Sequence, residues 1–335
     1  MSIETFGWPT APSTQAPLAY RYDRTVEDAF LDLFLPGAPL QVLVEYARDA
    51  PYPLDLQFRR SIQNGAQRAV LYAGLQAVLT VHWQMGRVRL DGHSKYAKHV
   101  RFGFKGRWGE RMPADGIADE MDAIEQYLEL VIPKVSPSAK EGAVQAAIAT
   151  FSGGNGAILD REFAPQFVDE ATREQVLDDV TADLRAIVEP LSARGQLPPM
   201  PERFGPRCDV LAVRNGRFET IEVKPRGVSS LVWSPIQVIV YARLVRRWLE
   251  DDLAARSILE RIAEQRRRIG LIRSTVPLPD ADAVIPVIAI QQGPASTYRD
   301  GLREVAAALH DAGIAEAEQL EVDEVSLTGR MRRLQ

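Results

Sequence analysis

Two short runs of the chain are spaced so that their ionisable side chains could act together. The runs are Cys208 to Val213 and Phe218 to Lys224, and both are rich in apolar and β-branched residues. Asn215-Gly216 lies between them, and this dipeptide between alternating apolar runs is the strongest short-range signal for a β-hairpin. With these two as loop residues, every facing pair keeps the sum of its residue numbers constant along the hairpin.

In this register Asp209 lies opposite Glu222, with the two Cβ atoms about 4.5–5.5 Å apart on one face of the sheet. Lys224 is expected on the same face, because strand side chains alternate. Opposed carboxylates repel each other and raise the pKa of one of them unless a cation lies between them. Oxygen ligands suit Mg²⁺, for which we expect Mn²⁺ to substitute, and a nearby lysine could orient water or neutralise charge on a phosphate. The predicted chemistry is phosphodiester hydrolysis.

The same residues resemble the motifs of the PD-(D/E)XK nuclease superfamily, which has the restriction-endonuclease-like fold. Asp209 is followed by Glu222-Val223-Lys224 and then by Gln237-x-x-x-Tyr241, as in RecB-like branches, and the resemblance covers roughly residues 165 to 325. Cys208 stands where the family motif has proline. The resemblance implies metal binding by Asp209, Glu222 and the main-chain carbonyl of Val223, with Lys224 as the catalytic lysine and Gln237 and Tyr241 in support.

The superfamily often adds an acidic residue from the helix before the hairpin. Glu174 is one candidate, because it lies three residues before Leu177 on the apolar stripe of a predicted helix. Glu170 and Glu162 remain open as alternatives.

Each of these residues also has a purely structural interpretation. Asp209, Glu222 and Lys224 could lie on a solvated sheet face with an incidental cross-strand pair. Ser234 to Gln237 has the pattern of a capping box with Ser234 as N-cap, so capping alone could explain Gln237. Tyr241 could be a core aromatic on the stripe with Leu244 and Trp248.

A second region has the composition of a surface that follows a phosphate backbone, with cations and aromatic residues interleaved. The run Val100 to Lys105 alternates as a half-exposed strand, and an amphipathic strand with a basic solvated face is the alternative. Arginines 243, 246, 247 and 266–268 could extend this basic surface, although helix-surface charge also explains them. The candidate nucleic-acid contacts are Lys95, Lys98, Arg101, Lys105, Arg107 and Trp108.

These side chains need elements to hold them, and the patterns indicate an α/β protein with two parts. We expect a flexible arm at 1–19, an N-terminal α+β domain for recognition or partner binding at 20–151, and a separate restriction-endonuclease-like domain at 157–335. The glycine-rich tract 152–156 marks the boundary between them. The second domain is expected to contain a mixed sheet flanked by helices. The expected helices span about 25–35, 119–131, 138–151, 169–189 (ending before Pro190), from 234 onward and 302–310, and the expected strands 79–90 (turning at Gly86), 208–213, 218–224, 284–290 and 319–327.

Composition limits the class of protein. The 335 residues include 40 Lys+Arg and 45 Asp+Glu, a net charge of -5, and 46% hydrophobic residues, which fits a globular chain and excludes a disordered one. One cysteine, Cys208, cannot form an internal disulfide, and no secretory signal or membrane span is expected. We therefore expect a cytoplasmic location without membrane association.

The leading hypothesis is a Mg²⁺-dependent nuclease acting on DNA, and the resemblance implies a role in restriction or phage defence. Two alternatives stay open: an RNase with the same site, and a non-catalytic nuclease-like subunit that binds nucleic acid or acts as a scaffold. A homodimer or a defence-system partner protein is a further expectation, since cutting both strands usually requires two sites.

Overall fold

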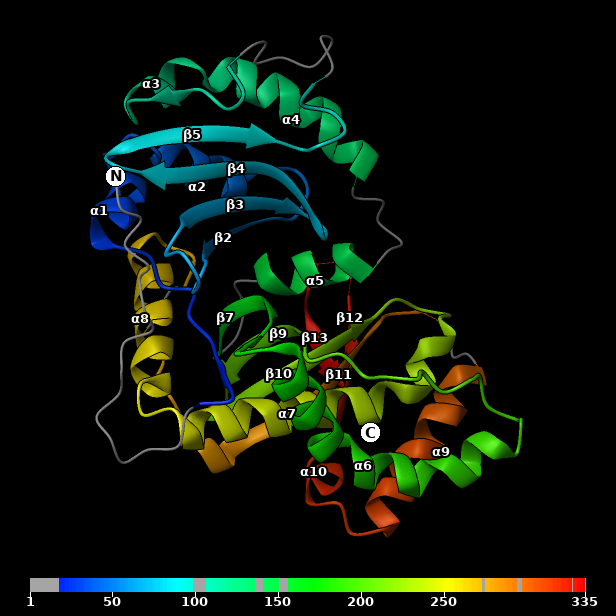
Figure 1. Cartoon of the computed structure of the whole chain (residues 1–335). Coiled ribbons are helices and arrows are strands. Elements are labelled where there is room, and N and C mark those ends of the chain that lie inside the picture. Colours follow the sequence, from blue (N-terminus) through cyan, green and yellow to red (C-terminus); the bar gives the residue numbers. More distant parts are fainter. Residues whose placement is uncertain are drawn as a thin grey trace.

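The computed structural model describes residues 18–98, 107–135, 141–150, 156–272, 275–293, 297–326 and 328–334. Within them the chain forms a mixed α/β structure with two large sheets and one two-stranded sheet (Figure 1), so the α/β class is confirmed. No helix in these ranges is long and apolar enough to span a bilayer. Most of the predicted arm and nearly all of the predicted boundary tract lie outside the described residues.

The N-terminal sheet is antiparallel, with five strands in the order β2-β3-β4-β5-β6. The predicted turn at Gly86 is confirmed, because Met85 and Gly86 join β4 to β5 with φ angles of 52° and 74°. The strands are β2 (Leu54–Arg60), β3 (Gln67–Ala73), β4 (Gln76–Gln84), β5 (Arg87–Gly92) and β6 (Arg111–Met112). The helices packed with them are α1 (Asp28–Leu31), the 3-10 helix η1 (Asp32–Phe34), α2 (Gln41–Asp49), α3 (Gly116–Asp119) and α4 (Met121–Val135).

The second large sheet is mixed and has six strands in the order β13-β12-β11-β10-β9-β7. β10 pairs antiparallel with β9 and parallel with β11, and β11 in turn pairs parallel with β12. A parallel neighbour requires a crossover, which α7 supplies between β10 and β11. The strands are β7 (Gly156–Phe163), β9 (Cys208–Arg214), β10 (Arg217–Lys224), β11 (Val284–Gln291), β12 (Glu321–Val325) and β13 (Met331–Arg333).

Helices cover both faces of this sheet. Val144 and Ile148 of α5 pack on one face, and the larger apolar cluster on the other face includes α6, α7 and α9. The predicted helix end before Pro190 is wrong: α6 continues for one more turn, where Leu191 is buried in the core. The elements are α5 (Glu141–Thr150), α6 (Glu170–Ala193), η2 (Ser229–Trp233), α7 (Ser234–Asp251), α8 (Ala255–Arg268), η3 (Ala281–Ala283), α9 (Thr297–Asp311) and α10 (Ala315–Glu318).

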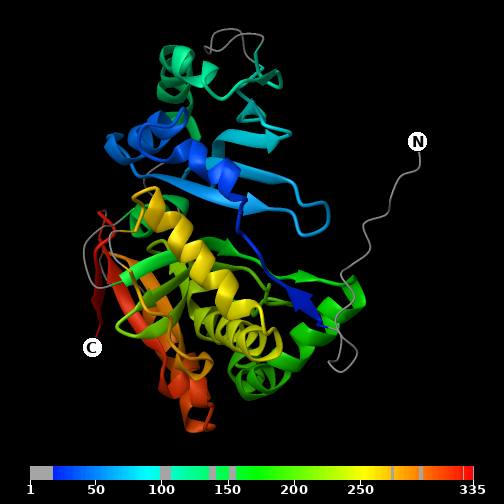
Figure 2. The same cartoon turned by 90° about the vertical axis from the view of Figure 1, so that its left-hand side faces the viewer.

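The two halves of the chain are packed together by elements from both. β1 (Tyr20–Arg21) pairs with β8 (Gln166–Phe167), α5 lies between the two large sheets (Figure 1), and α8 extends from one half to the other (Figure 2). Buried ion pairs join the halves, among them Arg59 with Asp160 and Arg161 with Asp55. The domain division at 152–156 stays a prediction, and elements on either side of it pack across it.

Candidate functional site

The hairpin that carries the acidic residues forms in the predicted register. Asn215 and Gly216 have φ angles of 50° and 72°, the left-handed conformation that a tight two-residue turn requires. The ladder then pairs Arg217 with Arg214 and continues to Ile221, which pairs with Val210.

Beyond that pair the two strands are joined by the side chain of Asp209 and no longer by a backbone pair. Its Oδ2 accepts a 2.7 Å hydrogen bond from the amide nitrogen of Val223, the residue after Glu222. Both acidic residues therefore lie just past the last backbone pair. This arrangement brings them to one end of the sheet by a side-chain contact that the predicted register did not include.

The three ionisable residues of the hairpin are buried. Exposed fractions are 8% for Asp209, 1% for Glu222 and 6% for Lys224, so the alternative of a solvated sheet face is wrong. The Lys224 Nζ forms an ion pair with Oε1 of Glu222. Glu222 Oε2 is buried and accepts no hydrogen bond of standard geometry from the described residues, although the Tyr241 hydroxyl lies near enough to lower the pKa of Glu222.

Burial and mutual repulsion shape the protonation of these groups. Burial, followed by the charge of Glu222, raises the pKa of Asp209 well above its usual range. Burial also raises the pKa of Glu222, although Lys224 opposes the shift. Burial lowers the pKa of Lys224, but the charge and hydrogen bond of Glu222, together with the charges of Asp209 and Glu141, outweigh burial and the net direction is upward. The site has more carboxyl groups than its one lysine can neutralise, and a cation would favour the ionised form of these carboxyl groups.

Sequence reasoning missed a third acidic residue, Glu141. It is the first residue of α5, and its carboxylate adds to the upward shifts of the pKa of Asp209 and Glu222, after burial and the nearer charges. Burial raises the pKa of Glu141 itself, while Lys224 lowers it. No sequence signal pointed to it, because the packing of α5 on the six-stranded sheet brings it to the site.

Two of the predicted acids are on α6 and lie in exposed ion pairs. Glu174 pairs with Arg203, and Glu170 pairs with Arg173 one turn along the same helix. Glu162 is on β7 and pairs with Arg207, and its charge raises the pKa of Glu141, so it lies within electrostatic reach of the site. Glu174 is therefore not placed with the hairpin acids.

Gln237 and Tyr241 face the site from α7. Trp233 is the N-cap of α7 without a side-chain capping bond, and Ser234 Oγ donates to the Ser230 carbonyl, so the predicted capping box does not form. Instead, the Gln237 side-chain amide donates a 2.6 Å hydrogen bond to the Tyr241 hydroxyl.

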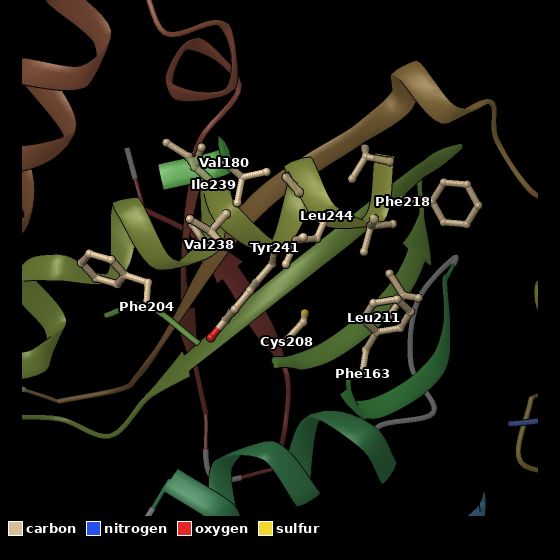
Figure 3. Close-up of a cluster of buried hydrophobic side chains, with 14 of the residues drawn as sticks. Phe163, Val180, Phe204, Cys208, Leu211, Phe218, Val238, Ile239, Tyr241 and Leu244 are labelled. Atoms are coloured by element: carbon tan, nitrogen blue, oxygen red, sulfur yellow. The ribbon is translucent and has the colours of Figure 1, made fainter. Parts of the chain in front are cut away.

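Tyr241 belongs both to the core and to the site. Its ring is 2% exposed and lies in the apolar cluster between α7 and the sheet, near Cys208 and Leu244 (Figure 3). Burial, followed by the charge of Glu222, raises the pKa of the Tyr241 hydroxyl well above its usual range. The packed-aromatic interpretation holds for the ring, and the hydroxyl remains available for the polar site.

The described residues of the predicted basic and aromatic segment make their contacts within the N-terminal half and not with the hairpin acids. The predicted strand Val100–Lys105, with Arg101 and Lys105, lies outside the described residues. Lys95 contacts the Tyr96 ring, and Lys98 is exposed in the same turn. Arg107 pairs with Glu120, while Trp108 packs against Tyr127. Tyr127 belongs to α4, which lies on the side of the N-terminal sheet away from the six-stranded sheet (Figure 1).

The arginines of the two helices after Pro235 do not form a free basic surface. Arg243 pairs with Asp183, Arg246 with Glu316, and Arg247 lies 3.8 Å from Asp179. In α8, Arg266 is buried, Arg267 pairs with Glu264, and Arg268 pairs with Asp28 and Asp32. Internal ion pairs thus account for their charge.

Among the described residues, no three His, Cys, Asp or Glu side chains converge as a ready metal-ligand set. The donors nevertheless fit a hard cation in chemical type, since the buried Glu222 Oε2 accepts no hydrogen bond of standard geometry and the carboxyl groups outnumber the one lysine. Comparison with protein-family models, curated proteins and solved structures gives no match.

Proposed function

We propose that the chain is a metal-dependent nuclease that hydrolyses DNA phosphodiester bonds. The observation that carries the proposal is the pair of buried carboxylates, Asp209 and Glu222, beside Lys224 at the ends of adjacent strands. Burying such groups lowers stability unless a bound ion compensates, so a site that keeps them favours a function that needs them. The mixed sheet with helices on both faces also agrees with the restriction-endonuclease-like fold that the sequence motifs imply.

Asp209, Glu222 and the Val223 carbonyl would hold Mg²⁺. The Val223 amide donates to Asp209 and so points towards β9. Within a strand the N–H and C=O of one residue point to the same side, so the Val223 carbonyl is also directed towards β9. A bound divalent ion would supply Lewis-acid stabilisation of the phosphate and a more acidic water.

Lys224 is placed to counter charge that develops on the phosphate. Its ion pair with Glu222 fixes the ammonium group next to the carboxylates, and its raised pKa keeps it protonated at neutral pH. A preorganised cation of this kind stabilises an anionic transition state without reorganising solvent. Gln237 and Tyr241 face the carboxylates from α7, and their mutual hydrogen bond fixes both side chains.

The test is incubation of the purified protein with plasmid, linear duplex and single-stranded DNA, and with RNA of matching sequence, in Mg²⁺ or Mn²⁺. We expect cleavage of DNA, and a loss of about 100-fold or more in Asp209→Asn and Lys224→Ala. Asn keeps an oxygen acceptor for the Val223 amide, so the first variant changes charge with little change in shape. Equal cleavage by wild type and both variants would refute the proposal. Cleavage of RNA alone would favour the RNase, and binding without turnover the non-catalytic subunit.

A further inference from the structure

A groove of about 980 Å³ lies between the two halves of the chain and reaches the candidate site. One wall is the β2–β3 turn, with Arg60, Ser61, Gln63 and Arg68. The facing wall is the segment through β8 to the start of α6, together with residues 205–207. Gln237 and Tyr241 also line the groove, so it leads to the side chains that face Glu222.

The groove is lined by more positive than negative side chains. Asp169 and Glu170 are its acidic members, and Asp169 accepts a hydrogen bond from the Thr172 amide as the N-cap of α6. Phe167 adds a partly buried aromatic ring, which also packs against Tyr20. The five basic members are Arg24, Arg60, Arg68, Arg173 and Arg207.

Several of these arginines keep their charge accessible. Arg68 is exposed and forms no ion pair with another described residue. Arg60 lies 3.8 Å from Asp23, a distance beyond that of a hydrogen bond. Arg207 exposes 66% of its side chain while it contacts Glu162. An anionic ligand could therefore contact these guanidinium groups without first breaking a buried interaction.

The two walls of the groove are held in place by buried polar contacts beneath it. Arg59 of β2 donates a 2.6 Å hydrogen bond to Asp160 of β7 and another to the carbonyl of Arg161. Asp160 also accepts a hydrogen bond from the Tyr22 hydroxyl, which holds the segment after β1 against β7. A groove built on such contacts is preformed, so binding costs little reorganisation.

We infer that this groove binds one strand of DNA through its phosphate backbone, and that the β2–β3 turn of the N-terminal half is a substrate-binding element. A positive groove beside an aromatic ring is the usual combination for single strands. A volume of about 980 Å³ is that of a small-ligand site. A site of this size suits a short stretch of one strand. The inference deepens the proposed function and rests on it for the identity of the ligand.

The experiment measures the fluorescence anisotropy of a labelled oligothymidine in EDTA, where cleavage plays no part. We expect Arg68→Glu to weaken binding by about tenfold or more, and Arg68→Glu with Arg207→Glu to weaken it further. The slope of log K against log salt should fall by about 0.7 for each phosphate that the variant no longer neutralises. Arg303→Glu is the matched control, because Arg303 is 72% exposed on α9 outside the groove, and we expect unchanged affinity.

Unchanged affinity in the double variant would overturn the inference, as would stronger competition by a duplex of the same sequence than by the single strand. A circular-dichroism melt of each variant confirms that it is folded. Binding and cleavage assays on the same proteins separate this inference from the proposed function. Strand binding by a wild type that cleaves no DNA supports the groove and refutes the nuclease. Cleavage that depends on Asp209 but is insensitive to Arg68 and Arg207 supports the nuclease and refutes the groove.

Discussion

The side-chain amide of Gln237 donates a 2.6 Å hydrogen bond to the hydroxyl of Tyr241, one turn further along α7. This bond uses the polar group that a capping role would have required, and it directs two polar side chains from a largely buried helix towards Glu222. Burying a hydroxyl lowers the stability of the protein unless the hydroxyl is hydrogen-bonded. The pair therefore links the core of the C-terminal half to the candidate site.

Deletion of that hydroxyl should reduce both stability and activity. For Tyr241→Phe we expect a loss of about 0.5–1.5 kcal/mol in unfolding free energy, the usual net value of one hydrogen bond, and a decrease in cleavage of about tenfold. Urea unfolding and initial cleavage rates measure the two effects. Tyr20→Phe is the matched control, because it removes a buried hydroxyl that donates to the Leu244 carbonyl away from the site. It should lose similar stability and keep full activity. An equal loss of activity in both variants would contradict the role of Tyr241.

Glu141 should contribute to the site, whereas Glu174 should not. We expect Glu141→Gln to raise the Mg²⁺ concentration for half-maximal cleavage by about 10–100-fold, because it removes negative charge that acts on Asp209 and Glu222. Glu174→Gln changes an exposed ion pair with Arg203 and should leave that concentration unchanged. A Mg²⁺ titration of cleavage rate compares them, and the reverse ranking would restore Glu174 as the helix-borne acid.

The contrast between these two glutamates shows what local sequence could determine. The hairpin register was predictable because Asn215-Gly216 fixes it within a few residues. The position of Glu141 was not, since it depends on α5 packing against strands that begin further along the chain. For the same reason the contact of Arg59 with Asp160 has no sequence signature. The Gln237 side chain had two local interpretations, and the position of the N-cap at Trp233 decided between them.

Neutralising one carboxylate should stabilise the metal-free protein. We expect Asp209→Asn to raise the unfolding free energy in EDTA by about 1–3 kcal/mol, because it removes a buried negative charge while keeping an acceptor for the Val223 amide. Mg²⁺ should stabilise the wild type, by about 2.7 kcal/mol at 100 times its dissociation constant, and should have little effect on the variant. Urea unfolding with and without Mg²⁺ measures both. A wild type whose midpoint does not respond to Mg²⁺ would argue against a metal at Asp209.

The buried ion pairs between the halves should contribute strongly to stability. Asp160 is 1% exposed and accepts hydrogen bonds from Arg59 and Tyr22, so Asp160→Ala leaves a buried guanidinium uncompensated. We expect a loss of about 3–5 kcal/mol in unfolding free energy. Asp49→Ala removes an exposed ion pair with Arg48 and should cause no measurable loss. Similar unfolding midpoints for the two variants would show that the network adds little.

The acid side of the stability profile should depend on Glu316. Burial opposes its ionisation, but Arg243, a backbone hydrogen bond and Arg246 together outweigh burial and hold its pKa below the ordinary value. A carboxyl with a lowered folded-state pKa stabilises the protein above its unfolded pKa of about 4.3, and this contribution disappears as the pH falls through the folded pKa. Wild type should therefore be more stable than Glu316→Gln at pH 7, and the difference should shrink below about pH 4.3. Urea unfolding of both proteins across this range measures it. A difference that stays constant down to the lowest pH would mean that Glu316 acts through packing alone, because an uncharged interaction has no reason to follow the titration of the carboxyl.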